Sequence, residues 1–399
     1  MSNNVKYGIG IILNAIVIMF CTGSVLQTFL LECGFSEKQV YLYNAMIQGV
    51  QVVVMVISIF FSDFIKKITK AVGFMHLAWL FFLFALFFLS GNRKGNIALS
   101  IGVMFTVAFF VYCVYGIQSV ELYRLPYSII DIKDYGKVSG ITTGLSGAAC
   151  FGISVLYSYL VTNFDFFSIS TIFFVLSAVF CVCAFLSYFT MKERPIPVRQ
   201  MSCKNRDLKI FKNKKMYWLL LPNFVRGIAT GIVGLLTVIG FSKGILNRES
   251  ASYMNIALQV ATFGGNLFFA FFCQKFSSRN LLIISTFVFC LLLPFSVVRE
   301  QTVDFILIYF IVRFFLMIID VAIPVLVTEI ISYEQIGAFT AIRLAVFTFG
   351  SAVASLVMDW LIGVVGYLGL LVVASVTQLG CGVGYYLASR LTKEKEKQA

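Results

Sequence analysis

The stretch Met191–Lys215, MKERPIPVRQMSCKNRDLKIFKNKK, decides how the rest of the chain is interpreted. It is the longest polar interval of the 399-residue sequence and lies almost at its midpoint. Nine of its 25 residues are Lys or Arg, and two are prolines. Nearly unbroken apolar sequence lies on both sides of it. We therefore expect a polar connector between two membrane-embedded halves.

The composition supports a membrane protein. The chain is 60% hydrophobic and only 12% charged, whereas a soluble globular domain has about 25% charged and roughly 45–50% apolar residues. A soluble fold of this length cannot bury that much apolar surface, so lipid must be the solvent. We expect an integral membrane protein.

Twelve apolar runs are long enough to cross a bilayer, which takes about 20 residues per helix. Six precede the connector, at 8–30, 41–64, 72–90, 97–119, 138–161 and 169–190, and six follow it, at 216–240, 251–273, 281–298, 304–327, 338–361 and 367–388. The first run is too long for the core of a cleaved signal peptide, so we expect it to be retained. The fold predicted is an all-α membrane protein with two pseudo-symmetric six-helix bundles, 1–190 and 216–399, joined by the connector 191–215.

The basic residues predict the orientation. If the N-terminus is cytoplasmic, the cytoplasmic segments hold 22 Lys and Arg and the outer loops hold 6, while three arginines lie within helices. Positive residues gather on the cytoplasmic side of membrane proteins. We therefore expect both termini and the connector in the cytoplasm, most simply at the plasma membrane. The net charge of +13 then reflects topology and not nucleic-acid binding.

Two short internal similarities indicate a duplicated six-helix unit. Tyr43–Gln48 resembles Met254–Gln259 at an offset of 211 residues, and Ile129-Ile130 parallels Ile330-Ile331 at an offset of 201. Because six is an even number, both copies enter the membrane from the same side, which is a parallel repeat about the membrane normal.

This arrangement resembles the major facilitator superfamily. Between the second and third runs, Asp63 with Lys66 and Lys67 is similar to the loop motif of that family, although Ile59 stands where a glycine is usual. The resemblance implies two bundles around a central cavity and transport by alternating access.

Two further stretches resemble the glycoside–pentoside–hexuronide cation symporter branch of this superfamily. They are Lys6–Gly10 and Ser332–Glu334, while Ile11 occupies a place where that branch commonly has an acid. This departure puts coupling to a cation in doubt.

Polar side chains at helical spacing within a spanning helix must face water or another helix, because facing lipid is costly. Asn223, Arg226, Thr230 and Thr237 share one face of the run 216–240. Arg226 lies near the midplane, where a cation needs water, a counter-ion or an anionic substrate. Either it binds a substrate anion or it forms a structural ion pair.

The run 304–327 carries Tyr309, Arg313 and Asp320 on one broad face. Arg313 and Asp320 are about 10 Å apart along the helix, too far for a direct pair. We expect Arg313 to contact substrate. For Asp320 we favour an ion pair with Arg343, structural or gating, and the alternative is a proton site.

Uncharged polar residues complete the predicted binding site. These are the amides Asn44, Gln48, Asn255 and Gln259 at matched positions of the two copies, and Tyr112 and Tyr115 in the run 97–119. The alternative for the amides is hydrogen bonding between helices, and for the tyrosines it is ordinary packing.

The remaining acids are candidates for coupling or gating. Glu121 and Asp63 lie at the predicted cytoplasmic ends of helices, and His76 is the only histidine, which we expect to be solvated at the interface. The ten cysteines form no metal-binding or redox motif. We predict no catalytic set, no cofactor and no metal, and therefore no enzyme.

The function predicted is secondary active transport of a small organic solute, anionic or polyhydroxylated, such as a sugar acid or carboxylate. Proton or sodium are possible coupling partners, and we expect a monomer. The alternatives are efflux of amphipathic or apolar compounds, which the 43 phenylalanines equally suit, and a non-transporting receptor on the same fold.

Overall fold

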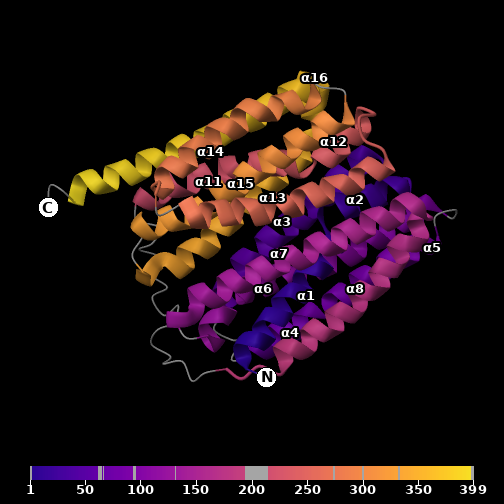
Figure 1. The fold of residues 1–399 in the computed structure, drawn as a ribbon, viewed down its shortest axis with the longest axis horizontal. Coiled ribbons are helices and arrows are strands. Elements are labelled where there is room, and N and C mark those ends of the chain that lie inside the picture. Colours follow the sequence, from indigo (N-terminus) through magenta and orange to yellow (C-terminus); the bar gives the residue numbers. More distant parts are fainter. Residues whose placement is uncertain are drawn as a thin grey trace. The chain divides into compact units, whose positions relative to one another are not determined.

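The structure is a computed structural model. It describes residues 2–61, 65, 67–92, 96–130, 132–193, 214–272, 275–298, 301–330 and 333–396. These residues form helices joined by short turns, with no strand among them, and Figure 1 shows their order along the chain. The all-helical class predicted from the sequence is confirmed.

The first half contains eight helices. In chain order they are α1 (Asn3–Cys21), α2 (Gly23–Glu32), α3 (Glu37–Phe61), α4 (Ile68–His76), α5 (Ala78–Gly91), α6 (Ile97–Ile129), α7 (Ile132–Asn163) and α8 (Phe166–Phe189). Only one residue separates α1 from α2, and only one separates α4 from α5, so each of these pairs is one interrupted segment. The first half therefore has six helical segments.

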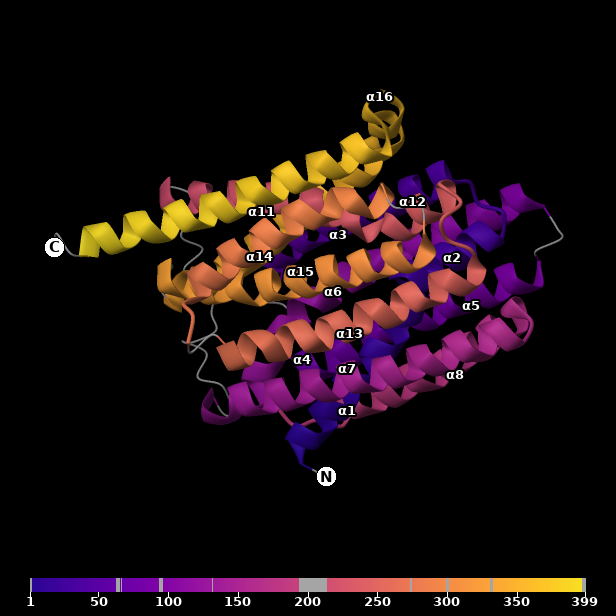
Figure 2. The same cartoon turned by 45° about the horizontal axis from the view of Figure 1, so that its top comes forward.

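The second half repeats this arrangement. Its helices are α11 (Lys214–Gly234), α12 (Leu236–Ser242), α13 (Arg248–Phe272), α14 (Ser278–Leu292) with the short 3-10 helix η2 (Leu293–Val297), α15 (Thr302–Ile330) and α16 (Tyr333–Glu396). α16 is two helices with a break at Gly366, whose φ of 68° is left-handed backbone that glycine adopts without strain. Figure 2 shows the chain reversing there. Counting interrupted pairs once gives six segments again, and twelve in the described chain.

Length and composition identify these segments as membrane-spanning. Nine helical stretches of the described chain are long and apolar enough to cross a bilayer, or ten with α11 and α12 as one bent span. One of the nine, Ile342–Ser389, covers both parts of α16. α13 is not among them. The chain is an integral, multi-pass membrane protein.

The helix bounds show the internal repeat more clearly than the sequence does. α3 and α13 begin and end 211 residues apart, and α7 and α16 begin 201 residues apart. The turns before α3 and α13 contain Gly34 and Gly244, both with positive φ. The offset decreases over two segments, because α14–η2 is shorter than α4–α5 and α15 (29 residues) is shorter than α6 (33 residues). Both offsets seen in the sequence therefore belong to one duplication whose second copy is shorter.

Contacts divide the chain into two compact units. Unit 1 comprises Met1–Cys203 and Ala251–Gln259, and unit 2 comprises Lys204–Ser250 and Val260–Ala399. The boundaries expected from the sequence, at residues 190 and 216, stay a prediction, because most of the connector lies outside the described residues.

One end of unit 1 is fastened by polar contacts between the chain's start and the segment after α8. Lys6 Nζ donates to the Thr190 carbonyl (2.6 Å), and Ser187 Oγ donates to the Lys6 carbonyl (2.6 Å). Glu193 Oε1 accepts from both the backbone N–H and the hydroxyl of Thr69 at the start of α4 (2.7 Å each). Beside them an apolar cluster from α1, α4, α6 and α8 is buried. Both polar and apolar contacts therefore hold the helices together at this end of unit 1.

In unit 2, α11 and the first part of α16 pack backbone against backbone. A Cβ on Gly227 would collide with the Phe347 carbonyl oxygen, and a Cβ on Gly350 would collide with the Phe224 carbonyl oxygen. One turn further, a Cβ on Gly231 would lie 2.8 Å from Ser351 Oγ. Small residues at such a crossing let membrane helices approach closely, and this contact holds the position of Arg226.

We expect G227A to lower the stability of the protein by about 1–3 kcal/mol, because the added methyl meets backbone that cannot move aside without separating two helices. The measurement is the apparent Tm of purified protein in nanodiscs. The matched control is G234A on the same helix, where a Cβ would meet nothing within 4 Å. Equal Tm values for the two variants would contradict the close crossing.

Candidate functional site

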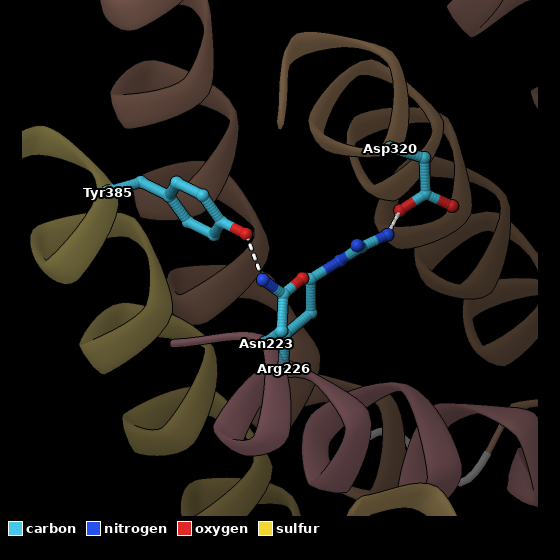
Figure 3. A network of polar contacts seen from close by, with 4 residues as sticks. All are labelled: Asn223, Arg226, Asp320 and Tyr385. Atoms are coloured by element: carbon cyan, nitrogen blue, oxygen red, sulfur yellow. Dashed lines mark hydrogen bonds and ion pairs between the residues drawn. The ribbon is translucent and has the colours of Figure 1, made fainter. Parts of the chain in front are cut away.

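A polar cluster lies inside unit 2, where α11, α15 and α16 meet. Asn223 Nδ2 donates to Tyr385 Oη, and also to the Leu219 carbonyl at 2.7 Å. One turn along α11, the Arg226 guanidinium forms an ion pair with Asp320 of α15 through Nη2 and Oδ1. Figure 3 shows the two side chains leaving neighbouring turns of α11 in different directions, one toward Tyr385 and one toward Asp320.

The ion pair is asymmetric in its exposure. The Arg226 side chain is 8% exposed, whereas the Asp320 side chain is 33% exposed. The Arg226 guanidinium also lies 4.8 Å from the centre of the Phe347 ring, a cation–π contact that further fixes it. The arginine is therefore held in place, and the carboxylate is the accessible partner.

The sequence prediction that Asp320 pairs with Arg343 is wrong. Asp320 forms its ion pair with Arg226 instead. Arg343 Nε is buried without a hydrogen-bond partner. Arg343 still belongs to the cluster, because it and Arg226 both interact electrostatically with Cys381 and Tyr385. Position along each helix does not determine the direction in which the Asp320 and Arg343 side chains point.

The Arg313 side chain binds a backbone carbonyl at the point where the neighbouring helix is interrupted. α11 ends at Gly234 and α12 begins at Leu236 with a bend of 42°. The Val233 carbonyl at this end accepts from Arg313 Nη2 at 3.2 Å, and a cation there is favoured by the negative end of the α11 dipole. The guanidinium also lies 5.2 Å from the Tyr309 ring centre. Arg313 Nε is left without a hydrogen-bond partner.

The electrostatic balance of this cluster is positive. Among the described residues, Arg226 and Arg343 both interact with Tyr385, Asp320 is the carboxylate bound to Arg226, and Arg313 lies on the same helix as Asp320. Arg313 and Asp320 are seven residues apart on α15, about 10 Å along the helix. Cations inside a membrane protein need counter-charges or water. The cluster is therefore a candidate site for an anion.

The predicted residues of unit 1 lie in a different environment. Tyr112 is buried, its hydroxyl donates to the Cys21 carbonyl at 3.4 Å, and its ring packs edge-on against Trp79. Tyr115 packs edge-on against the same tryptophan, with ring centres 5.1 Å apart. On α3, Asn44 and Gln48 are half-buried, and Gln48 Oε1 has no partner. The two tyrosines form an aromatic cluster with Trp79, and Gln48 has hydrogen-bonding capacity to spare.

Of the predicted residues on α13, Asn255 is buried and Gln259 is half-buried. Asn255 Nδ2 donates to Ser154 Oγ of α7 (2.7 Å), and Ser252 is bonded to Ser158 one turn further along α7 (2.7 Å). Asn255 therefore joins helices within unit 1, as the alternative interpretation of the amides proposed.

Glu121 and Asp63 are the two remaining acidic residues that the sequence suggested for coupling or gating. Glu121 is completely buried on α6, although it was expected near the interface. Asp63 lies outside the described residues.

His76 is also buried, and the expectation of a solvated interface residue is wrong. Gln118 Nε2 lies 3.3 Å from His76 Nδ1, and the ring of Tyr188 packs edge-on against the imidazole. The sequence analysis did not single out Gln118, Tyr188 or Tyr385. The sequence offered one indication that Gln118 is buried with Glu121: the two are three residues apart and so lie on nearly the same face of a helix.

No group of three or more His, Cys, Asp or Glu side chains in the described chain is arranged to hold a metal ion. The polar clusters are consistent with binding of organic or ionic solutes through hydrogen bonds and charge.

Comparison with known proteins identifies the fold. No family model matches the chain, and no curated protein sequence matches it. Among solved structures, a D-xylose–proton symporter superimposes with a TM-score of 0.68 at 12% identity, covering 96% of each chain. The nucleoside transporter NupG gives 0.62 at 14% identity with 99% coverage of both chains. A bacterial homologue of the iron transporter ferroportin, in its outward-facing state, gives 0.68 at 12% identity, covering 98% of this chain and all of that one.

These structures are transporters of the major facilitator type, and the likeness spans whole chains. The protein therefore has the twelve-helix fold of this superfamily, and the resemblance noted in the sequence is confirmed at the level of fold.

We expect R226Q and D320N each to destabilise the protein by about 1–3 kcal/mol. This is less than the roughly 3–5 kcal/mol lost when a fully buried pair is broken, because Asp320 is partly exposed. The double variant should lose less than the sum, since neither charge is left alone. Apparent Tm values of the four proteins in nanodiscs measure this coupling.

The control for this cycle is K275Q, which removes an exposed charge of unit 2 and should leave the Tm within experimental scatter. Strictly additive effects of R226Q and D320N would contradict the ion pair.

Proposed function

We propose that the protein is a secondary transporter of a small organic anion, such as a sugar acid or a carboxylate. The observation that carries this proposal is that two arginines within the spanning helices of unit 2, Arg226 and Arg343, are buried, whereas the carboxylate that binds Arg226, Asp320, is partly exposed. Alternating access would come from movement of one six-helix bundle, 1–190, against the other, 216–399.

The arginines have hydrogen-bonding capacity that the protein leaves unused. Arg313 Nε and Arg343 Nε are buried donors with no acceptor. An unsatisfied buried donor costs about 1–3 kcal/mol, and more for a charged group. Guanidinium groups bind carboxylates through two parallel hydrogen bonds, so an organic acid satisfies both the charge and the free donors.

Asp320 gives the site a means of releasing its anion. Its carboxylate is more exposed than the arginine it binds. A substrate carboxylate therefore competes with Asp320 for Arg226, and the site alternates between an internal and an external anion. Such a competition keeps Arg226 paired at every stage, which lowers the cost of carrying a charge through the membrane.

The aromatic content gives little support to the alternative of apolar efflux. Phe81, Phe84 and Phe271 are at least 70% exposed on helices that lie in lipid. These phenylalanines lie on the lipid-facing surface and do not line a binding site.

Transport rather than catalysis is supported by the fold, since the structures it resembles are transporters. The positive-inside distribution of Lys and Arg supports cytoplasmic termini and a cytoplasmic connector. We extend the proposal to the plasma membrane and to a monomer that carries one substrate at a time.

The proposal predicts that hexuronates or small carboxylates raise the apparent Tm of the protein in nanodiscs, because ligands stabilise the state they bind. The panel should pair each acid with its neutral analogue, for example D-glucuronate with D-glucose. Any acid that binds is then tested for counterflow in proteoliposomes, which separates a transporter from a receptor. Stabilisation by the neutral sugar equal to that by the acid would contradict an anion site.

R313Q and R343Q should each weaken binding of that acid at least tenfold, or about 1.4 kcal/mol. The matched control is R279Q, which removes an arginine that lies against the Tyr386 ring, 5.4 Å from its centre, and should bind normally. If both R313Q and R343Q bind the acid with unchanged affinity, the arginine cluster is not the site.

A further inference from the structure

One surface of unit 1 combines a group of lysines with exposed apolar side chains. The lysines lie where the start of the chain contacts the segment after α8, and they are Lys6, Lys67, Lys70 and Lys192. We propose that this surface binds an anionic phospholipid, with its phosphate at the lysines and an acyl chain along α4 and α8. The inference goes beyond the proposed transport function, because it concerns the lipid around the protein and not the transported solute.

Contacts between the first helix and the segment after α8 bring two of the lysines together. Lys6 Nζ of α1 donates to the Thr190 carbonyl at 2.6 Å. The Lys192 backbone N–H donates to Asn3 Oδ1 at 3.2 Å, and Asn3 Nδ2 donates to the Lys192 carbonyl at 2.6 Å. The backbone of Lys192 is therefore held beside the first turn of α1, which also carries Lys6.

The other two lysines are at the start of α4, which packs against the end of α8. Lys67 directly precedes α4, and Lys70 lies in its first turn with Nζ 5.1 Å from the centre of the Phe189 ring on α8. This cation–π contact holds the Lys70 ammonium group beside the end of α8. Glu193 Oε1 accepts from the Thr69 hydroxyl at 2.7 Å and so connects the same turn of α4 to the segment after α8. All four lysines therefore converge on one end of unit 1.

The net charge of this end is positive. Among the described residues, Glu193 supplies one carboxylate here, so four lysines and one glutamate leave a net charge of +3. None of the four lysines forms an ion pair with a carboxylate in the part of the chain that the structure describes. Three of them are exposed and accessible to a ligand, namely Lys67, Lys70 and Lys192. A compact negative charge, such as that of a phosphate, complements this surface.

An apolar surface continues from the lysines along α4 and α8. The rings of Phe74, Phe185 and Phe189 pack on one another, with centres between 5.4 and 5.6 Å apart. Phe74 is 58% exposed, and on α8 Leu186 is 51% and Val182 is 41% exposed. Because these side chains face outward from unit 1, they offer an acyl chain an extended apolar contact.

The order of the side chains along the helices matches the order of the groups in a phospholipid. Phe74 follows Lys70 by one turn of α4, about 6 Å along the helix, and Phe185 precedes Phe189 by the same distance on α8. The charged groups thus lie at the helix ends, and the rings lie further into the span. Lysine can place its apolar stem on such a surface while its ammonium group stays in water at the interface. A headgroup phosphate and the first part of an acyl chain fit these two zones together.

The excess of lysine favours an anionic lipid over a neutral one. Basic residues at the ends of spanning helices attract acidic headgroups. In phosphatidylcholine the phosphate is followed by a quaternary ammonium group, which the lysines repel, whereas phosphatidylglycerol carries the phosphate charge alone. A soluble acidic partner would gain from the lysines but not from the exposed rings, so the lipid is the better complement.

The contact that holds Lys70 has a counterpart in unit 2. There the Arg279 guanidinium, in the first turn of α14, lies 5.4 Å from the centre of the Tyr386 ring on α16. α4 and α14 are corresponding helices of the duplication, and so are α8 and the second part of α16. A cation over an aromatic ring is thus common to both copies, whereas the four lysines belong to unit 1. Arg279 therefore provides a matched control.

Quenching by brominated lipids tests the proposal without any transported substrate. The variant L186W places an indole on the exposed face beside the three rings, and its quenching is the increase over that of the parent protein. Because the bromines are carried on an acyl chain, they report the whole lipid and not a free phosphate. We expect dibromo-phosphatidylglycerol to bind at least about fivefold more tightly than dibromo-phosphatidylcholine, since each nearby lysine contributes roughly that factor.

In the L186W background, K67Q/K70Q/K192Q should lose this preference, because it removes the exposed lysines and leaves Lys6 in its contact with the backbone. R279Q, the matched control, should retain the preference. Equal binding of the two lipids by L186W, or the same preference in the triple lysine variant, would overturn the proposal.

A second measurement uses the protein without the introduced indole. Its apparent Tm should be higher in nanodiscs of phosphatidylglycerol than in nanodiscs of phosphatidylcholine, because a bound lipid stabilises the folded state, and K67Q/K70Q/K192Q should lose that gain. A Tm that is the same in both lipids would also overturn the proposal. Neither readout depends on whether any acid is transported, so failure of the transport proposal is recognised separately.

Discussion

Lipid is the solvent for most of this chain, and lipid offers no hydrogen bonds. Every backbone group within the membrane must therefore be satisfied by the protein, which is why the described chain is helical from end to end. The points where a helix stops inside a span become significant for the same reason. At the end of α11 the exposed Val233 carbonyl is bonded by Arg313, so the interruption of one helix fixes the position of a charged side chain on another. A charged side chain thus lies where the backbone hydrogen bonding of a spanning helix is interrupted.

The two units share a helix plan and differ in what they bury. In unit 2 the buried charges are permanent, because guanidinium groups keep their protons, and they are arranged around one partly exposed carboxylate. In unit 1 the buried groups include a histidine and a glutamate, His76 and Glu121, both 0% exposed. The two copies of the helix plan therefore bury different polar side chains.

Most of the fold could be predicted from the sequence, because apolar length is a strong signal. The twelve runs, the duplication and its two offsets all follow from composition and spacing. The partners of the buried charges could not be predicted. Depth along a helix placed Asp320 and Arg343 at one level, but the rotation of each helix, and which helices cross, turned Asp320 toward Arg226. His76 was misassigned for a related reason: one polar residue near a helix end has no periodicity, so its sequence does not tell whether it faces water, lipid or the inside. The breaks after Cys21 and Gly234 were also not predicted, since both fall within apolar runs long enough to be read as continuous helices.

Those two breaks occur at corresponding places, in the first segment of each copy. A continuous helix resists bending because each turn is held by bonds to the next, and tilting one part against the other means breaking several at once. At Thr22 and Leu235 part of that ladder is already absent. The first segment of each copy therefore consists of two shorter helices joined at one residue. One of the two helices can tilt while the other stays packed. We expect bending to be easier at these interruptions, and at Leu77 between α4 and α5, than along the continuous helices.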